Sequence, residues 1–418
     1  MADTVSNDPR SAIFTDAAAY ADQERWHAVA AELRAEDPVC RFEVEGYRPF
    51  WAVTRHADVF EVSRRSDVFL NTRESVLGPD FQTQMMEALL GDLPKTLVHM
   101  DGHEHTAYRH VANDWFKPAA VKQRQGAIDT IADEFADRML EFDGSCDFAQ
   151  DVAAPFTLRV IMSIFGVPES DERTMLELTQ GLFGAADPEF MGDFSDPFEA
   201  VMSMVRRFDE YFKALSSDRR ACPTDDLATV LANGQVDGCP MGDVETLWYY
   251  IIVATAGHDT TSYALSGGWE ALLRNPDQLA RLQQDPGLVG NAAEEMIRWT
   301  APVRHFLRYA QTDVEVGGVV VPEGERVLLS YPSANRDERV FADPMRFDVD
   351  RPNAKDLMSF GLGVHYCLGS QFARREVRTL TEKVLARISH IELAGAPEFA
   401  EANFVGGVKH LPVAFRAR

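Results

Sequence analysis

Residues 360–369 read Phe-Gly-Leu-Gly-Val-His-Tyr-Cys-Leu-Gly, and the rest of the chain is organised around this stretch. Glycines at 361, 363 and 369 allow tight turns and a close approach of the backbone to a flat or bulky group. Cys367 stands where this loop passes into a helical pattern, since apolar residues recur at three- and four-residue steps over 373–388. A thiol at a helix N-terminus meets unpaired amide donors, which favour its thiolate form.

Two interpretations of Cys367 follow from these residues alone. A thiolate presented by a glycine-rich loop suits a soft metal, and cysteine-bound haem iron is one instance. An unpaired cysteine is otherwise a small buried apolar residue. The loop is not a nucleotide-binding fingerprint, because Gly361 and Gly363 lack the third glycine of that motif.

The composition indicates a globular protein and argues against several classes. Hydrophobic residues make up 45% and charged residues 26% of the 418 residues, which is ample material for a core. The formal charge of −25 argues against nucleic acid or an anionic membrane surface as the main partner. Five cysteines without CxxC pairing predict neither a disulfide framework nor a zinc ribbon. No apolar run approaches the ~20 residues of a membrane span, and we expect a cytoplasmic protein without a signal peptide.

The patterns along the chain predict one domain, residues 1–418, that is mainly helical with smaller β-sheets. Alternating residues over 39–53 predict short strands, and helical patterns dominate 120–217. Val314–Val321 together with Val327–Leu329 is expected to form a hairpin.

The longest apolar helix is predicted over residues 243–273. Within it, Ala256-Gly257-His258-Asp259-Thr260-Thr261 places a glycine, an acid and two β-branched hydroxyl residues mid-helix, where all are locally unfavourable. Residues with low helix propensity inside a core helix often mark a functional site. The alternative is a tolerated polar patch that faces solvent.

Four histidines between His99 and His110 invite a zinc site, but the HExxH spacing is absent. His105 and Arg109 are four residues apart and therefore share one helix face. Two donors on one face could hold anionic groups such as carboxylates. The alternative is a solvated polar helix.

Glu295 and Arg298 are three apart on a later helix and, taken alone, are an ordinary surface pair. Together with the acid–alcohol pair of the long helix, with Arg351 and with the Cys367 loop, in that order, they resemble the cytochrome P450 family of haem-thiolate monooxygenases in its soluble bacterial form. The resemblance covers essentially the whole chain, and the cysteine segment is very specific. It implies the cytochrome P450 fold, an α+β triangular prism with haem b between a long distal helix and a proximal cysteine loop.

The resemblance implies a set of haem contacts. Cys367 would be the axial thiolate of the iron, with Phe360 beside the sulfur and with Gly363 and Gly369 giving backbone access. The donors to the two haem propionates would be His105, Arg109, Arg308 and His365. A structural triad that supports the proximal side would consist of Glu295, Arg298 and Arg351.

The resemblance also implies the catalytic and substrate contacts. Thr260 would steady bound dioxygen and Asp259 would relay protons, while Gly257 would open the helix for oxygen and water. Residues 75–95 and 183–198 would be mobile cover over the pocket. The pocket itself would be lined by Val253, Ala256, Phe306, Phe404 and Val405, which suits the hydroxylation of an unactivated C–H bond in a compact hydrophobic substrate.

Three segments point to a subfamily: Trp299–Pro302, Tyr331–Asp337 and Asn403–Gly407 are most similar to terpenoid hydroxylases, the terpineol-hydroxylating group in particular. A terpenoid or alkylaromatic substrate is therefore favoured, with polycyclic aromatic or steroid substrates as alternatives. Arg304 and His305 are polar residues near the segment that often touches substrate, which leaves room for a substrate that carries a polar group.

The resemblance implies separate electron donors, a [2Fe-2S] ferredoxin and a flavin reductase that uses NAD(P)H, and a monomeric protein. A local basic docking face for the ferredoxin is predicted from Arg109, Lys117, Lys122, Arg124, Arg374, Arg375 and Arg378. Ordinary helix-surface charge is the alternative. Two rival functions share the fold: a peroxide-using haem enzyme, against which the Asp259–Thr260 pair argues, and a non-enzymatic haem sensor.

Overall fold

The computed structural model describes residues 8–71, 74–81, 84, 96–183, 187–190, 194 and 197–418. Its α-helices are α1 (Ala12–Thr15), α2 (Gln23–Glu36), α3 (His56–Arg64), α5 (Gly102–Phe116), α6 (Pro118–Gln123), α7 (Gln125–Leu140), α8 (Ala154–Phe165), α9 (Glu172–Phe183), α10 (Pro197–Ala221), α11 (Leu227–Ala232), α12 (Asp243–Arg274), α13 (Pro276–Gln284), α14 (Val289–Thr300), α15 (Tyr331–Ala334) and α16 (Ser370–Arg387). Its strands are β1 (Val39–Phe42), β2 (Phe50–Val53), β3 (Phe69–Leu70), β4 (Ser145–Asp147), β5 (Gln235–Val236), β6 (Cys239–Pro240), β7 (His305–Ala310), β8 (Val314–Val316), β9 (Val319–Val321), β10 (Arg326–Ser330), β11 (Ile388–Leu393), β12 (Glu398–Phe399), β13 (Val408–His410) and β14 (Pro412–Ala417).

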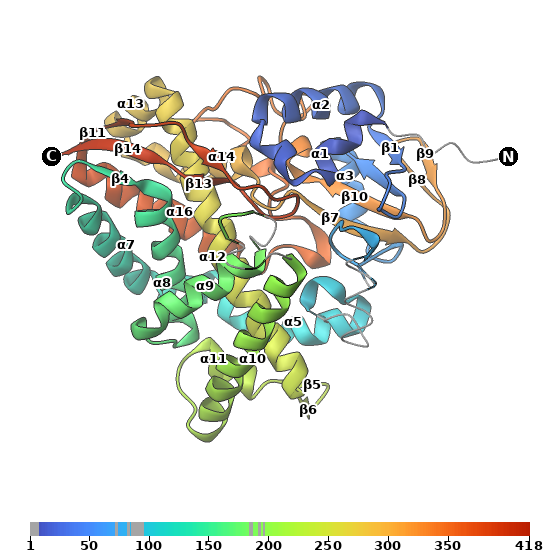
Figure 1. The fold of residues 1–418 in the computed structure, drawn as a ribbon, viewed down its shortest axis with the longest axis horizontal. Helices are drawn as coiled ribbons and strands as arrows, with labels where there is room; N and C mark the ends of the chain where they lie inside the picture. The colour runs from blue at the N-terminus through green and yellow to red at the C-terminus, as the bar shows by residue number, and fades with distance from the viewer. Residues whose placement is uncertain are drawn as a thin grey trace.

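A five-stranded sheet in the order β1-β2-β10-β7-β3 lies with the N-terminal helices on one side of the molecule, and most helices lie on the other side (Figure 1). The predicted strands over 39–53 are confirmed as β1 and β2, which pair antiparallel. The predicted hairpin of 314–321 with 327–329 is wrong, because a turn falls inside 314–321. Strands β8 and β9 do form a hairpin, but β10 pairs with β2 and β7 instead of joining it.

Helix α12 runs through the middle of the molecule and packs against α8, α14 and α16 (Figure 1). It confirms the long apolar helix predicted from the sequence. A Cβ added at Gly257 would lie 2.9 Å from Cδ1 of Ile161 on α8. Gly257 therefore lies close to α8, and its role in opening the helix for oxygen and water stays a prediction.

The chain as described is mainly helical with small sheets, as predicted. Within the described ranges, one helical stretch, Phe148–Phe165, is long and apolar enough to cross a membrane, but 72% of it is buried inside the protein, as in a core helix. Most of the predicted covers 75–95 and 183–198 lies outside the described residues.

Candidate active site

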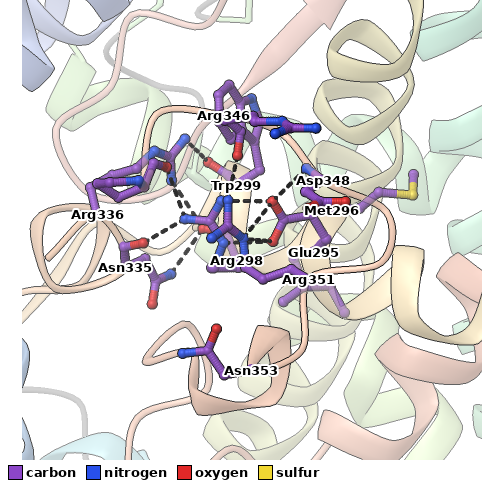
Figure 2. A network of polar contacts seen from close by, with 12 residues as sticks. Glu295, Met296, Arg298, Trp299, Asn335, Arg336, Arg346, Asp348, Arg351 and Asn353 are labelled. Atoms are coloured by element: carbon purple, nitrogen blue, oxygen red, sulfur yellow. Dashed lines mark hydrogen bonds and ion pairs between the residues drawn. The ribbon is translucent and has the colours of Figure 1, made fainter. Parts of the chain in front are cut away.

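Glu295 lies between two arginines in the interior. Its carboxylate accepts hydrogen bonds of 2.7 Å from both Nε and Nη2 of Arg298 on the same helix, α14. The Nε of Arg351, from a loop 56 residues further on, lies 3.1 Å from each carboxylate oxygen. The Glu295 and Arg298 side chains are 0% exposed. Figure 2 shows the Arg298 and Arg351 side chains converging on this carboxylate.

Asn335 connects this network to the cysteine loop. Its amide Nδ2 donates to the carbonyl of Arg298 at 3.0 Å and to Oγ of Ser359 at 2.8 Å, and its Oδ1 accepts from the amide of Met358 at 2.6 Å. Ser359 in turn donates to the carbonyl of Ile297 on α14. The backbone just before Phe360 is thus held against α14 by buried hydrogen bonds. Sequence reasoning missed Asn335 and Ser359, because nothing local marks their contacts.

The loop itself turns at two glycines. Gly361 has φ +63° and Gly363 has φ +72°, a region that favours glycine. A Cβ on Gly363 would also lie 2.5 Å from the carbonyl oxygen of Ser63 on α3, so no larger residue fits. The amide of Cys367 donates to the carbonyl of Phe360 at 2.9 Å and closes the loop. The guanidinium of Arg374 lies 4.4 Å from the centre of the Phe360 ring.

Cys367 lies just before the first turn of α16, and although the residue as a whole is partly exposed, its thiol is enclosed by neighbouring groups. Burial raises its pKa, while the amides of Gly369 and Ser370 and the guanidinium groups of Arg109 and Arg374 oppose that shift. The expectation of a favoured thiolate is therefore wrong for the thiol by itself, because burial outweighs the helix N-terminus. The amides and guanidinium groups remain in place to stabilise negative charge on a metal-bound sulfur.

Four nitrogen donors gather beside this loop. The rings of His105 on α5 and His365 lie 4.1 Å apart. Arg109, one helical turn after His105, donates to the carbonyl of Tyr366 at 2.6 Å. Burial, His365 and Arg109 lower the pKa of His105 to about 4. Burial also lowers the pKa of His365, and the charges of Arg308 and Arg109 act in the same direction.

This donor set fits the haem group that the resemblance implies. The Nε2 atoms of His105 and His365 are buried without a hydrogen-bond partner, although the carboxylate of Asp101 lies 3.7 Å from His365. Buried donors of this kind need acceptors, and two carboxylates would supply them. Within the described ranges, no group of three or more His, Cys, Asp or Glu side chains could hold a metal ion. A metal bound by Cys367 would therefore have to bring its other ligands with it, as a porphyrin does.

In the middle of helix α12, Ile252, Ala256 and Thr260 form an accessible stripe at four-residue spacing, and most of the side chains around them are buried. The Thr260 hydroxyl donates to the Ala256 carbonyl at 2.8 Å, the expected bond back to residue i−4. Asp259 is buried beside this stripe, 6% exposed, with one oxygen 3.0 Å from Nδ1 of His258. A hydroxyl and a carboxyl thus occupy neighbouring faces of one helix.

The predicted substrate contacts come together in part. The rings of Phe306 on β7 and Phe404 lie 5.4 Å apart, and Val405 pairs with Val303 in an isolated bridge. Ala256 lies on the accessible stripe of α12, whereas Val253 is buried among the residues of the main core.

Arg304 and His305 have structural contacts in this structure. The Arg304 guanidinium lies 3.5 Å from the centre of the Tyr20 ring, and burial lowers its pKa to about 10. Nε2 of His305 accepts from the amide of Leu77 at 3.0 Å, and burial, with Arg304, lowers its pKa to about 3. Both side chains are fully enclosed by protein.

Comparison with known proteins places these features in a family context. The model of the family described as cytochrome P450 matches residues 13–405. Cytochrome P450-terp of Pseudomonas sp is 41% identical over 408 residues, which cover 95% of each chain. A steroid C26-monooxygenase of Mycobacterium tuberculosis is 34% identical over 386 residues, covering 92% of this chain and 98% of the relative.

Two solved structures share the fold. The crystal structure of CYP108D1 from Novosphingobium aromaticivorans superimposes with a TM-score of 0.91 at 40% identity and covers 98% of both chains. The cytochrome P450 CYP268A2 of Mycobacterium marinum, in complex with pseudoionone, has a TM-score of 0.87 at 31% identity, with 94% of this chain and 95% of that chain covered.

Proposed function

Since the chain belongs to the cytochrome P450 family and is a haem b monooxygenase, we propose that it hydroxylates an unactivated C–H bond of a compact hydrophobic molecule. The favoured substrate class is a terpenoid or an alkylaromatic compound. Polycyclic aromatic compounds and steroids are the alternatives to be tested beside it. We further propose that residues 1–418 act as one domain, as a cytoplasmic monomer.

The proposal is carried by the donors around the cysteine loop. In it, Cys367 ligates the iron, and the propionates are held by His105, Arg109, Arg308 and His365. When bound, the haem supplies the oxygen activation that no amino-acid side chain provides. Phe360 packs beside the sulfur under the Arg374 guanidinium. In this proposal, Gly363 and Gly369 give backbone access to the sulfur.

The chain's own residues would control protons and substrate. Thr260 offers a hydroxyl on the accessible stripe of α12, and Asp259 holds a carboxyl on the next face. Together they form the acid–alcohol pair that delivers protons in this proposal. Phe306 and Phe404 form an apolar wall that excludes water and fits hydrophobic ligands.

The buried triad of Glu295, Arg298 and Arg351 has a structural role in this proposal. Asn335 and Ser359 connect the triad to the backbone before Phe360, so the triad stabilises the position of the loop that carries the thiol. The triad thus contributes to haem retention and not to the chemical step.

A spin-state titration of the haem-loaded protein tests the substrate class. Terpenoids, alkylbenzenes, polycyclic aromatics and steroids are each added to the ferric protein, and the high-spin fraction is measured. Compounds that shift the spin state are then incubated with ferredoxin, reductase and NADH, and the products are identified. Spin shifts limited to steroids would overturn the terpenoid and alkylaromatic assignment. Product formation with added peroxide, but none with ferredoxin, reductase and NADH, would overturn the ferredoxin-dependent reaction.

We also propose that a ferredoxin docks on the predicted basic face, with fewer contributing residues than the seven that the sequence suggested. Arg374 is paired with Glu294 at 2.7 Å, Arg378 with Glu382 at 2.7 Å, and Lys117 with Asp114 at 2.6 Å. Paired cations contribute less to attraction at a distance. Lys122, Arg124 and Arg375, for which the structure describes no carboxylate within 4.0 Å, would therefore carry most of the attraction for an acidic partner.

Charge reversal separates the two sets of cations. Lys122→Glu should slow reduction by an acidic [2Fe-2S] ferredoxin more than Arg378→Glu does, and the difference should shrink as salt is added. Stopped-flow reduction rates at several ionic strengths provide the measurement. Rates that are independent of salt and equal in the two variants would contradict a basic docking face.

A further inference from the structure

Arg374 lies on α16 beside the cysteine loop, and three contacts hold its guanidinium group against that loop. Its Nε donates to Oε1 of Glu294 on α14 at 2.7 Å. Its Nη1 donates to the hydroxyl of Tyr366, the residue before Cys367, at 2.9 Å. Its Cζ lies 4.4 Å from the centre of the Phe360 ring. One positive charge is therefore fixed beside the segment that carries the thiol.

Tyr366 connects two cations to the cysteine loop. Its hydroxyl accepts from Arg374, and its carbonyl accepts from Nη2 of Arg109 on α5 at 2.6 Å. Both guanidinium groups act on Cys367, where they oppose the effect of burial on the pKa of the thiol. Their positive charges are therefore felt at the sulfur, the atom that would bind the iron.

Glu294 brings a negative charge to the same place. The residue is 7% exposed, and its Oε2 is buried with no hydrogen-bond partner in the described protein. Among the residues that the structure describes, Arg374 is the one cation that pairs with this carboxylate. A buried charge is screened by solvent and salt much less than an exposed one, so this carboxylate acts over a longer distance than a surface acid does.

Helix α14 thus carries two adjacent carboxylates with different partners. Glu295 bonds Arg298 and Arg351 in the buried triad. Glu294 contacts Arg374, a side chain that reaches the cysteine loop. The triad therefore accounts for Glu295 but leaves Glu294 without a role.

A charge near the sulfur affects the transfer of an electron to this site. When a reduced [2Fe-2S] ferredoxin gives up one electron, ferric iron is reduced to ferrous iron and the site gains one negative charge. Positive charge nearby favours the ferrous form, and negative charge nearby favours the ferric form. One unit charge as far away as about 24 Å changes the ratio of the two forms by about threefold at an effective dielectric constant near 20.

We propose that Glu294 and Tyr366 are positioning residues that hold the Arg374 guanidinium beside the thiol, and that the charges of Glu294 and Arg374 shift the reduction potential of the iron in opposite directions. The inference rests on the proposed function for the ligation of the iron by Cys367. Arg374 raises the potential and Glu294 lowers it. Glu294 therefore limits how readily the protein accepts an electron.

An equilibrium redox titration of the haem-loaded, substrate-free protein measures the ferrous-to-ferric ratio at a fixed potential. Glu294→Gln keeps an oxygen for Arg374 but removes the negative charge, and it should raise the ratio by at least about threefold, while Arg374→Gln should lower it by a similar factor. Glu382→Gln removes the carboxylate of the exposed pair with Arg378 and is the matched control, which should leave the ratio unchanged. A ratio in Glu294→Gln equal to that of the control, or below that of the wild type, would overturn the charge effect.

The sign of the shifts separates charge from loss of structure. A loosened loop would move both single variants in the same direction, whereas charge moves them in opposite directions. The double variant Glu294→Gln/Arg374→Gln restores the net charge and should bring the ratio back toward the wild-type value. A ratio in the double variant that lies further from the wild type than either single variant would overturn the charge effect as well.

Two further variants test the positioning of the guanidinium. Tyr366→Phe removes only the hydroxyl, and Arg374→Lys keeps the charge but loses the planar group that bonds two partners at once. Both should shift the ratio in the direction of Arg374→Gln, by a smaller factor. Ratios equal to that of the wild type in both variants would overturn the positioning roles.

The reduced carbon monoxide spectrum separates this inference from the proposed function. If the wild type and the variants keep the signature of thiolate ligation, the redox titrations decide the inference whether or not any substrate is oxygenated. A wild-type protein that has this signature but oxygenates no substrate would refute the proposed function alone. A wild-type protein without the signature would overturn both, since Cys367 would then not ligate the iron.

Discussion

Replacing Glu295 by glutamine removes the only carboxylate that contacts both buried arginines of the triad in the described structure. The wild-type carboxylate accepts from Nε and Nη2 of Arg298, from Nε of Arg351 and from the amide of Asp348. The remaining guanidinium nitrogens donate to backbone carbonyls, which hold the arginines in position. In Glu295→Gln, two guanidinium groups therefore stay buried without a counter-charge.

Removing one partner of a buried ion pair costs about 3–5 kcal/mol. Because Arg298 and Arg351 lose the same partner, we expect the upper part of that range, about 4–5 kcal/mol. Native domains are stable by about 5–15 kcal/mol in total, so this loss is a large fraction of the free energy of unfolding. The loop before Phe360 is tied to the same network, and haem retention should fall with it.

Urea unfolding of the haem-loaded protein, followed by circular dichroism and by the reduced carbon monoxide spectrum, measures the effect. Glu382→Gln is the matched control, since it removes the carboxylate of the exposed pair with Arg378, whose side chains are 49% and 35% exposed. An exposed pair contributes about 0–1 kcal/mol. Equal losses in the two variants would refute the argument that burial without a counter-charge causes the destabilisation.

Three further predictions concern other sites. Thr260→Ala should keep NADH consumption but divert it to peroxide, and tight coupling of NADH to product in this variant would rule out the proton-delivery role. Gly363→Ala should lower haem occupancy, measured as the haem-to-protein absorbance ratio, because its Cβ would meet the α3 backbone; full occupancy would contradict that clash. Burial lowers the pKa of His410, but the bonds to Asp147 and Glu189 outweigh it and raise the pKa above 6.5. The resulting stabilisation should be complete below pH 6.5 and lost as the pH rises through the raised value, so the difference in unfolding free energy between wild type and His410→Gln should shrink on that side; a difference that grows with pH would reverse the sign of this argument.

The local signals were enough to predict much of the fold. The apolar spacing over 243–273 is a property of neighbouring residues, and it predicts α12 to within one residue. The strands over 39–53 follow from the alternation of neighbouring residues in the same way. The partners of β10 were not predictable from such patterns, because a parallel neighbour can come from any distant part of the chain.

One expectation about a single residue failed because of packing by distant segments. The helix N-terminus was expected to favour the Cys367 thiolate, but burial by residues from other elements dominates its pKa. The spacing of residues in the sequence does not show how closely a distant helix or strand packs against a given residue.

By itself, the sequence determined the cysteine loop, the acid–alcohol helix and the order of the motifs, because each depends on residues within a few positions of one another. Only the tertiary structure decided what surrounds them. Asn335 reaches Arg298 across 37 residues and Ser359 across 24, and His258 reaches Ala154 across 104. Hydrogen bonds between distant segments depend on how the helices pack, so the support of the thiol appears only in the folded chain.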